Sequence, residues 1–269
     1  MILSNVHTHT RFSDGRDSAE DMVLEAIARG FVSLGFSDHG AAPHDDAGML
    51  PDVEPLYRKE ILRLKEKYAG QIEIALGYEH DFSMPGVDFS PYDYVIESVH
   101  FFDGWREASI DHSPECLFQA ADALYKGNPY GMCRDYFDLV IASINETTAE
   151  VVGHIELIRK FNEKWPMFDT NDPRYLEPAM EVVRTAAKKD ILVEVNTGAM
   201  SRGYRTSPYP DAMLLKYLKQ LGGRITITSD CHRKDWLDFA FEEAAELARS
   251  CGFTENWIWK DGQFRPVAL

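Results

Sequence analysis

Two histidines stand two residues apart near the start of the chain, in Asn5-Val6-His7-Thr8-His9, where an apolar run ends. In an extended strand alternate side chains share one face, so both imidazoles can converge on one cation. A neutral imidazole is the commonest metal ligand in proteins. The pair alone is weak evidence, but it makes metal-dependent hydrolysis the first hypothesis.

The same arrangement, a metal-ligand type of residue at the end of an apolar run, recurs down the chain. Short apolar, β-branched runs predict seven strands, at 2–6, 32–37, 72–76, 94–99, 151–153, 192–195 and 225–228. The polar residues that follow them are His7, His9, Asp14, Asp38, His39, Glu79, His100, His154, Glu194, Asn196, Asp230 and His232. A lone histidine is more often a hydrogen-bonded structural residue than a ligand. Six histidines together at strand ends, with Glu79 and Asp230, favour a metal cluster.

The elements that would position these residues alternate between strands and helices. Helical spacing is present at 18–29, 53–68, 173–188 and 211–221, and a last helix is expected at 235–250. Such alternation predicts a parallel sheet, and barrels of this kind commonly fill about 250 residues. We therefore expect one domain over residues 1–269, with the metal site at the carboxyl ends of the strands, where barrels keep their active sites.

The longest interval between predicted strands, residues 101–148, is too long for a simple loop. Its spacing predicts two helices, at about 114–126 and 131–145. We interpret the interval as an insertion on the same face as the strand ends, where it could cover a site.

The composition limits the partners. Lys plus Arg is 28 and Asp plus Glu is 44, a net charge of −16 that opposes a nonspecific grip on nucleic acid and fits a small substrate better. The four cysteines show no metal or disulfide spacing and are expected to be free thiols. No apolar run reaches the roughly 18 residues that span a bilayer, and the chain opens without a basic leader, so we expect no membrane association and a cytoplasmic protein.

Some of these polar residues have competing roles. Asp38 could hydrogen-bond a ligating imidazole and fix its tautomer instead of binding metal. Glu194 alternates with apolar residues and could lie in a barrel layer or pair with a basic residue. Cys231 lies between two proposed ligands and should point away from them. His44, His80 and His112 are assigned no role.

The motifs resemble those of the polymerase and histidinol phosphatase (PHP) superfamily, in the same order across the whole chain. They are His7-Thr8-His9 with Asp14, Ser37-Asp38-His39, Gly77-Tyr78-Glu79, Ser98-Val99-His100, Gly153-His154 and Ser229-Asp230-Cys231-His232. The resemblance implies a distorted, TIM-like (β/α)7 barrel with two or three divalent metal ions at the carboxyl ends of its strands. It implies three metal sites: His7, His9, Glu79 and Asp230; Asp14, His39 and His232; and Glu79, His100 and His154. Some members have His at the position of Asp14, and Zn, Mn and Fe all stay open as the metal.

Three further segments resemble the histidinol-phosphate phosphatase branch of that superfamily: 98–104, 153–160 and 194–198. In that branch an Arg soon follows Asn-Thr; here Ala199-Met200-Ser201 come before Arg202, which we expect to bind substrate. Arg159 is expected to hold the phosphoryl oxygens, since a guanidinium matches phosphate geometry. Its rival role is a helix-surface ion pair with Glu156.

The resemblance implies a metal-dependent phosphomonoesterase, a histidinol-phosphatase that hydrolyses L-histidinol phosphate in histidine biosynthesis. A phosphate monoester carries about two negative charges, so attack on it needs cations that offset the repulsion. Glu79 would be catalytic as a carboxylate shared by two cations, and Asp230, His232 or a bound water would protonate the leaving alkoxide.

Three other functions remain open. The chain could act on another small phosphoester or nucleotide, it could be a nuclease or editing module, or it could be a catalytically silent binding domain. The acidic balance counts against a nucleic-acid substrate, and the nine retained ligands count against a silent domain. The oligomeric state stays open.

Overall fold

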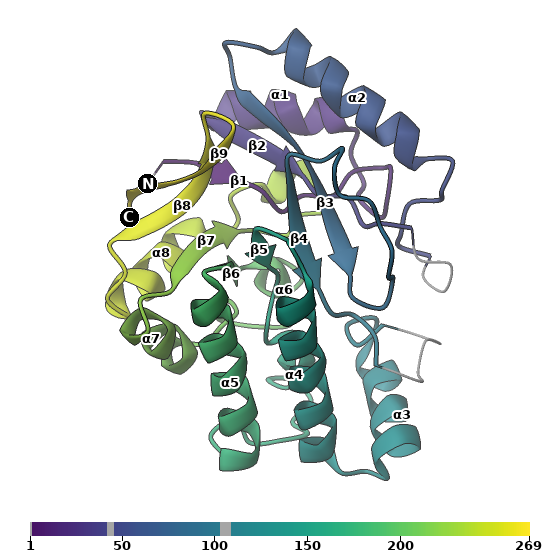
Figure 1. Cartoon of the computed structure of the whole chain (residues 1–269), viewed down its shortest axis with the longest axis vertical. Coiled ribbons are helices and arrows are strands. Elements are labelled where there is room, and N and C mark those ends of the chain that lie inside the picture. Colours follow the sequence, from purple (N-terminus) through teal and green to yellow (C-terminus); the bar gives the residue numbers. More distant parts are fainter. Residues whose placement is uncertain (1, 42–45, 103–108) are drawn as a thin grey trace.

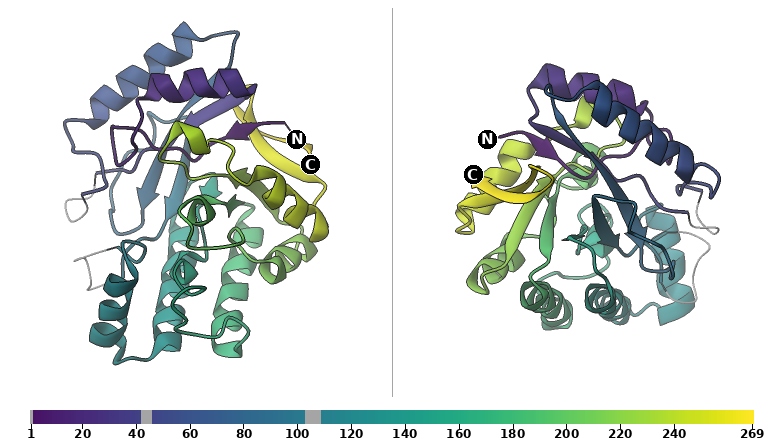
Figure 2. Two further views of the ribbon diagram at one scale, coloured as in Figure 1. Left: turned by 180° about the vertical axis from the view of Figure 1, so that it is seen from behind. Right: turned by 45° about the horizontal axis from the view of Figure 1, so that its top comes forward.

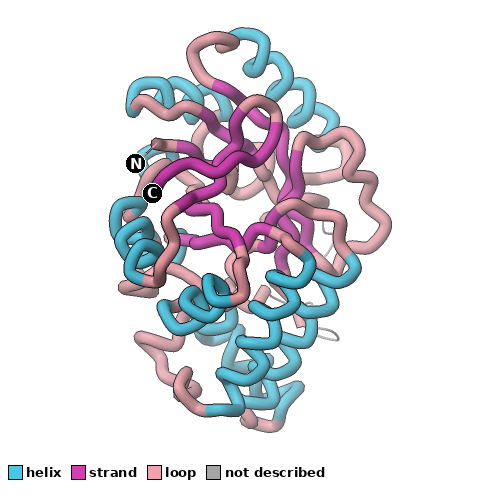
Figure 3. The backbone as a smooth tube through the Cα atoms, turned by 60° about the vertical axis from the view of Figure 1, so that its left-hand side comes forward, coloured by secondary structure: helices cyan, strands magenta, loops and turns pink. Residues whose placement is uncertain are grey.

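Seven parallel strands form a nearly closed barrel in the computed structural model, which describes residues 2–41, 46–102 and 109–269. The strands follow one another in chain order around the sheet: β1 (Ser4–Asn5), β2 (Ser33–Phe36), β3 (Glu73–Asp81), β4 (Tyr94–Ser98), β5 (Val151–Val152), β6 (Leu192–Asn196) and β7 (Arg224–Thr228). A parallel bridge between Thr8 and Cys231 joins the chain beyond β1 to the chain beyond β7. Figure 3 shows the strands at the centre and the helices around them. The predicted seven-stranded TIM-like barrel is confirmed.

The helices lie outside the strands, in two main groups (Figures 1 and 2). Helices α1 and α2 cover one side, and α3, α4 and α5 stand side by side on the opposite side. Their bounds are α1 (Ala19–Arg29), α2 (Glu54–Lys67), α3 (Pro114–Tyr125), α4 (Pro129–Glu146), α5 (Pro173–Lys189), α6 (Gly198–Ser201), α7 (Ala212–Gln220) and α8 (Phe241–Ser250), with 3-10 turns η1 (Leu157–Arg159) and η2 (Lys234–Trp236). No helix in these described ranges has the length and apolar character needed to cross a membrane.

Local sequence signals explain several of these boundaries. Ser18 caps α1 by accepting from the backbone N–H of Asp21, and Gly30 ends the helix in the left-handed conformation with a φ of 78°. Strands β2, β4 and β6 are buried throughout, as expected for parallel strands that are covered on both faces.

Two predicted boundaries were wrong. Strand β3 does not end at residue 76 but runs to Asp81, because β4 pairs with its polar end as far as Asp81 opposite Ser98. The predicted helix 235–250 is broken into η2 and α8, since Ala240 between them has a φ of 55°, which a continuous helix cannot contain.

A hairpin that the sequence analysis did not predict follows α8. Its strands are β8 (Glu255–Lys260) and β9 (Gln263–Ala268). Trp259 of β8 packs in one buried cluster with Tyr94, Ile96 and Val151 from the barrel strands. The Ser33 hydroxyl donates to the Trp259 carbonyl at 2.7 Å. The hairpin therefore adds core to the barrel end where the strands begin, away from the predicted metal ligands.

The interval between β4 and β5 contains the two predicted helices, α3 and α4. Residues 103–108 of this interval, with Asp103 and Gly104 of the 98–104 motif, lie outside the described residues. The stretch just before α3 contributes Ser109, Asp111 and His112 to the lining of a cavity at the strand ends. This stretch of the insertion therefore lies where it was expected, beside that site, whereas α3 and α4 lie outside the barrel strands.

Candidate active site

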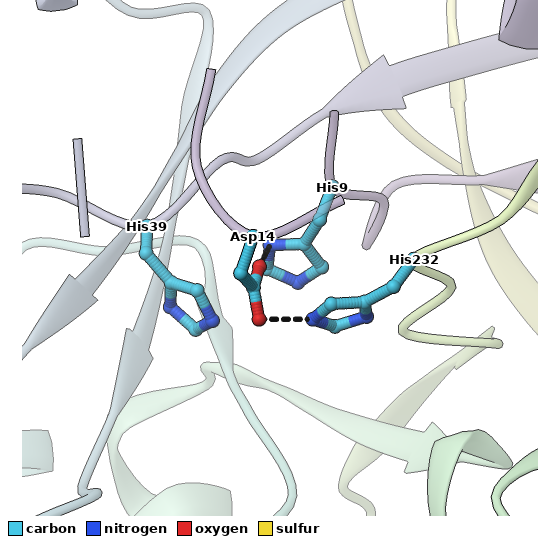
Figure 4. A group of neighbouring side chains, drawn as sticks. All are labelled: His9, Asp14, His39 and His232. Atoms are coloured by element: carbon cyan, nitrogen blue, oxygen red, sulfur yellow. Dashed lines mark ion pairs between the residues drawn. The ribbon is translucent and has the colours of Figure 1, made fainter. Parts of the chain in front are cut away.

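All nine predicted metal ligands meet at the carboxyl ends of the barrel strands. Their ligand atoms form four overlapping groups: His9, Asp14, His39 and His232; His7, His9 and Asp230; His7, Glu79 and His154; and His39, Glu79 and His100. Within each group the atoms lie within 4.8 Å of one another. Figure 4 shows the first group, with Asp14 between His39 and His232.

Glu79 lies at the centre of the cluster and its side chain is completely buried. Imidazole nitrogens surround its two oxygens: Oε2 is 3.0 Å from His7 Nε2, 3.4 Å from His9 Nε2 and 3.0 Å from His39 Nδ1, and Oε1 is 3.2 Å from His154 Nε2 and 3.6 Å from His100 Nε2. The Ser98 hydroxyl donates to Oε1 at 2.7 Å. A carboxylate in this position can be shared between two cations, as the resemblance implies.

Two further carboxylates, those of Asp14 and Asp230, line the same cavity as Glu79. Asp14 Oδ2 is 2.9 Å from His232 Nε2, and the rings of His232 and His9 stack with centroids 4.1 Å apart. Asp230 Oδ1 is 3.3 Å from His9 Nε2. His9 Nδ1 is 3.8 Å from Asp14 Oδ1. His9 therefore lies beside both carboxylates and belongs to two of the four ligand groups, rather than to the single site that the resemblance implied.

Burial and mutual contact set the charges of these groups. The pKa of His9 is lowered to about 3, by burial and by the imidazoles of His232 and His39. Burial alone would raise the pKa of Glu79, but the facing imidazoles of His7 and His39 hold it well below its usual value. Burial alone would lower the pKa of His7, but Glu194 and Glu79 raise it well above its usual value. Metal binding requires neutral imidazoles and ionised carboxylates, so His9 and Glu79 are already in the required state, whereas His7 would release a proton.

Several donor atoms of the cluster are buried without a hydrogen-bond partner in the described part of the chain. They are His7 Nε2, both ring nitrogens of His9, Glu79 Oε2 and His154 Nδ1. Buried polar atoms are nearly always hydrogen-bonded, so a concentration of exceptions needs an explanation. Nitrogen and oxygen donors at this spacing fit divalent transition metals.

Glu194 orients His7 from behind the cluster. Its Oε1 accepts from His7 Nδ1 at 2.5 Å and from the Thr228 hydroxyl at 2.5 Å, and its Oε2 accepts from the His154 N–H at 2.6 Å and from Asn196 Nδ2 at 3.0 Å. Of its two predicted roles, pairing with a basic residue is the one that the structure shows. The bond to Nδ1 leaves Nε2 of His7 facing Glu79.

Asp81 does the same for His100 and was missed by the sequence analysis. Its Oδ2 accepts from the backbone N–H of His100 at 2.8 Å and lies 3.1 Å from His100 Nδ1. The signal was present in the alternation of Glu79 and Asp81, but it was hidden because the strand was predicted to end before them.

Asp38 hydrogen-bonds no imidazole among the described residues, so the role suggested for it is corrected. Its carboxylate accepts from the Thr10 N–H at 2.7 Å and from the Ser13 hydroxyl at 2.6 Å. Burial raises its pKa to about 6. Asp38 therefore orders the turn that precedes Asp14. Cys231 is buried in the core beside the barrel, as the alternation predicted.

The cluster opens into a cavity of about 400 Å³. Besides seven of the predicted ligands it is lined by Asp46, Ala47, Ser109, Asp111, His112, Lys160 and Arg202. His112, to which no role was assigned, therefore lies at the site, while His44 lies outside the described residues.

Arg202 lies where a substrate-binding residue is expected. Its Nη2 is 2.8 Å from His232 Nδ1 and 3.4 Å from Asp230 Oδ1, and its side chain lines the cavity. Burial alone would lower the pKa of Arg202, but Asp230 raises it above its usual value. The guanidinium therefore stays positively charged and lies in contact with the metal-ligand cluster.

Arg159 is not brought to the cavity. Its Nη1 donates to Glu156 at 2.9 Å and to Asp211 at 2.8 Å, in a largely buried ion pair, because the 3-10 turn η1 directs it to these carboxylates. The next residue, Lys160, lines the cavity instead, with Nζ 2.9 Å from Asp111 Oδ2. The position of Arg159 thus fits the rival role, an ion pair with Glu156, and Lys160 is the cation that the sequence analysis overlooked.

Comparison with known proteins gives a consistent result. The family model described as PHP domain matches residues 5–198. The chain is 28% identical to a Schizosaccharomyces pombe protein named "Probable histidinol-phosphatase", over 97% of this chain and 90% of that protein. It is 25% identical to the histidinol-phosphatase of Bacillus subtilis, over 89% of this chain and 97% of that one.

A similar fold occurs in a solved structure from Lactococcus lactis, histidinol phosphate phosphatase complexed with zinc, L-histidinol and phosphate. The TM-score is 0.76 at 22% sequence identity, and the match covers 98% of this chain and 100% of that one.

Proposed function

Because the chain belongs to the PHP domain family, we propose that it is a metal-dependent phosphomonoesterase that hydrolyses L-histidinol phosphate to L-histidinol and phosphate. The observation that carries the proposal is the convergence of nine imidazole and carboxylate ligands in one cluster, which opens into a cavity that Lys160 and Arg202 also line. Relatives matched over nearly their whole length carry the histidinol-phosphatase name, which supports this substrate over other small phosphoesters.

We propose that the cluster holds two or three divalent ions of Zn, Mn or Fe, with Glu79 between them. One tetrahedral site uses only four ligands, so nine convergent ligands exceed what a single ion needs. The zinc in the Lactococcus lactis complex supports zinc as one of the metals. Bound divalent ions neutralise phosphoryl oxygens and make a water nucleophilic near neutral pH.

The protein's own side chains position the substrate. Lys160 and Arg202 are the cationic groups that we assign to the phosphoryl oxygens, because both line the cavity and Arg159 does not. The acidic side chains of Asp46 and Asp111 line the same cavity and suit the ammonium and imidazole groups of L-histidinol phosphate. The substrate has one anionic end and one cationic end, and the cavity offers both counter-charges.

The leaving alkoxide is strongly basic and needs a proton. Asp230 and His232, which follow β7, are the groups that we assign to this role. Arg202 contacts both of them and would hold them beside a phosphoryl group. A bell-shaped pH profile of kcat that loses one limb in His232→Asn would identify His232 as the donor, and an unchanged profile would leave Asp230 or a bound water.

A phosphate-release screen tests the proposal. Protein reconstituted with Zn, Mn or Fe is assayed against a panel of metabolite phosphomonoesters that includes L-histidinol phosphate. We expect L-histidinol phosphate to have the highest kcat/KM and chelation to abolish turnover. Activity on a different ester alone would replace the substrate, and binding of less than about one metal equivalent would remove the proposed cluster.

A further inference from the structure

A second cavity, of about 610 Å³, lies on the other side of the two strands that carry the centre of the metal-ligand cluster. Strands β3 and β4 lie side by side (Figure 1). His80 of β3 is paired opposite Glu97 of β4. Alternate side chains of a strand point to opposite faces. Glu79 and Ser98 therefore meet at the cluster, while His80 and Glu97 line the second cavity.

The second cavity combines an apolar wall with polar groups. Its lining includes Phe82, Val87, Phe89, Val99 and Leu139, and the end of α4 adds Glu146 at its edge. Ligand sites typically combine an apolar wall with polar groups that fix the orientation of the ligand. The size also lies within the usual range for small-molecule sites.

A buried carboxylate belongs to this lining, that of Glu97, which is 1% exposed. Its Oε2 lies 3.0 Å from His80 Nδ1, and its Oε1 is buried with no hydrogen-bond partner among the described residues. His80 cannot serve Oε1 as well, since its Nε2 lies 2.6 Å from the Met84 carbonyl and the Phe89 ring packs edge-on against its imidazole. A buried carboxylate oxygen is rarely left in this state.

The charge around the cavity defines the missing donor. The described residues that line it include two carboxylates, Glu97 and Glu146, and neither Lys nor Arg. The basic side chain among them is His80, whose two ring nitrogens already face Glu97 Oε2 and the Met84 carbonyl, so Glu97 Oε1 still lacks a donor. A ligand that completes this environment has a cationic N–H donor for Glu97 and an apolar body for the aromatic wall.

We propose that this cavity binds a small organic amine, whose ammonium group donates to Glu97 Oε1 and whose apolar body packs against Phe82, Phe89 and Leu139. The site shares no lining residue with the cavity of the metal-ligand cluster. Its occupation does not depend on the phosphatase activity proposed above.

Calorimetric titration of the metal-reconstituted full chain with three matched probes tests the class of ligand. The probes are benzylamine, benzyl alcohol and benzoate, with inorganic phosphate present throughout to compete at the metal cluster. We expect one equivalent of benzylamine to bind, benzyl alcohol to bind at least about tenfold more weakly, and benzoate not to bind, because a charge-assisted hydrogen bond is roughly twice as strong as a neutral one. Benzoate binding as tight as that of benzylamine would overturn the proposal.

Two variants test the location. Leu139→Trp fills the cavity without touching Glu97 and should abolish benzylamine binding, whereas Leu62→Trp on the exposed face of α2 should leave it unchanged. Glu97→Gln should weaken binding at least about tenfold. Melting curves show whether each variant is folded, and Leu139→Trp decides the question if Glu97→Gln is not. Benzylamine binding that survives Leu139→Trp, or no binding to the wild type, would refute the site.

Discussion

Replacing Glu194 by Gln should weaken metal binding and lower stability together, because this carboxylate both orients a ligand and satisfies four donors. Its Oε1 accepts from His7 and Thr228, and its Oε2 accepts from the His154 N–H and from Asn196. A glutamine side chain has the same shape but only one accepting oxygen. Whichever way the amide turns, two buried donors face an NH₂ group.

The cost follows from these contacts. Each buried donor left without an acceptor costs about 1–3 kcal/mol, and partial relaxation makes about 2–4 kcal/mol a reasonable total for the two. For a chain of this size that corresponds to a fall of roughly 5–15 °C in Tm. Loss of the charge that fixes the His7 ring should also weaken metal binding by about 10- to 100-fold, the usual effect of removing a partner of a ligating imidazole.

Two measurements check this prediction. Zinc affinity is measured by competition with a chromogenic chelator, starting from chelator-treated protein, and Tm is measured by calorimetry with and without zinc. Glu66→Gln, on the exposed surface of α2, is the matched control and should change neither value. If Glu194→Gln keeps the zinc Kd and the Tm of the wild type, then Glu194 does not orient His7 in the way described.

Three further substitutions separate the roles of charged residues at the site. Glu79→Gln should lower kcat at least about a hundredfold, since it removes the carboxylate shared within the cluster; near-normal turnover would contradict the central role of Glu79. Lys160→Gln should lower kcat/KM for L-histidinol phosphate by at least about tenfold, as a charge-assisted contact contributes about 1.5–3 kcal/mol; an unchanged value would exclude a phosphoryl contact. Arg159→Lys should lower Tm through its buried ion pair and change kcat/KM less than about threefold. A tenfold fall in kcat/KM at constant Tm would instead restore the predicted phosphate contact of Arg159.

The parts of the fold that local sequence determines could be predicted. The apolar run that becomes β6 and the capped helix α1 depend on burial and on short-range hydrogen bonds, so their patterns are visible without the rest of the chain. The end of β3 depends on its partner, because polar residues such as His80 remain in the strand only through pairing with β4. The hairpin of β8 and β9 was overlooked although Asp261-Gly262 at its turn is a common hairpin signal.

The same distinction holds for the site. Ligands at the ends of parallel strands must meet, so the topology alone brings His7, Glu79 and His154 together. Arg159 and Lys160 are adjacent and carry the same charge. Which of them lines the cavity depends on a 3-10 turn, and no periodic pattern in the sequence predicts that turn. Short irregular turns of this kind are fixed by tertiary contacts, here the buried carboxylates of Glu156 and Asp211.

The charge of the cavity connects the metal requirement to the substrate. Five carboxylates line it (Asp14, Asp46, Glu79, Asp111 and Asp230), and its described Lys and Arg side chains are Lys160 and Arg202. With neutral imidazoles this lining has a formal charge of −3, which would repel a phosphate ester. One divalent ion would leave a charge of −1, whereas two would bring it to +1 and three to +3. On this count a dianionic phosphoryl group is attracted only when at least two ions are bound. The bound metals would therefore give this acidic chain its affinity for an anionic substrate.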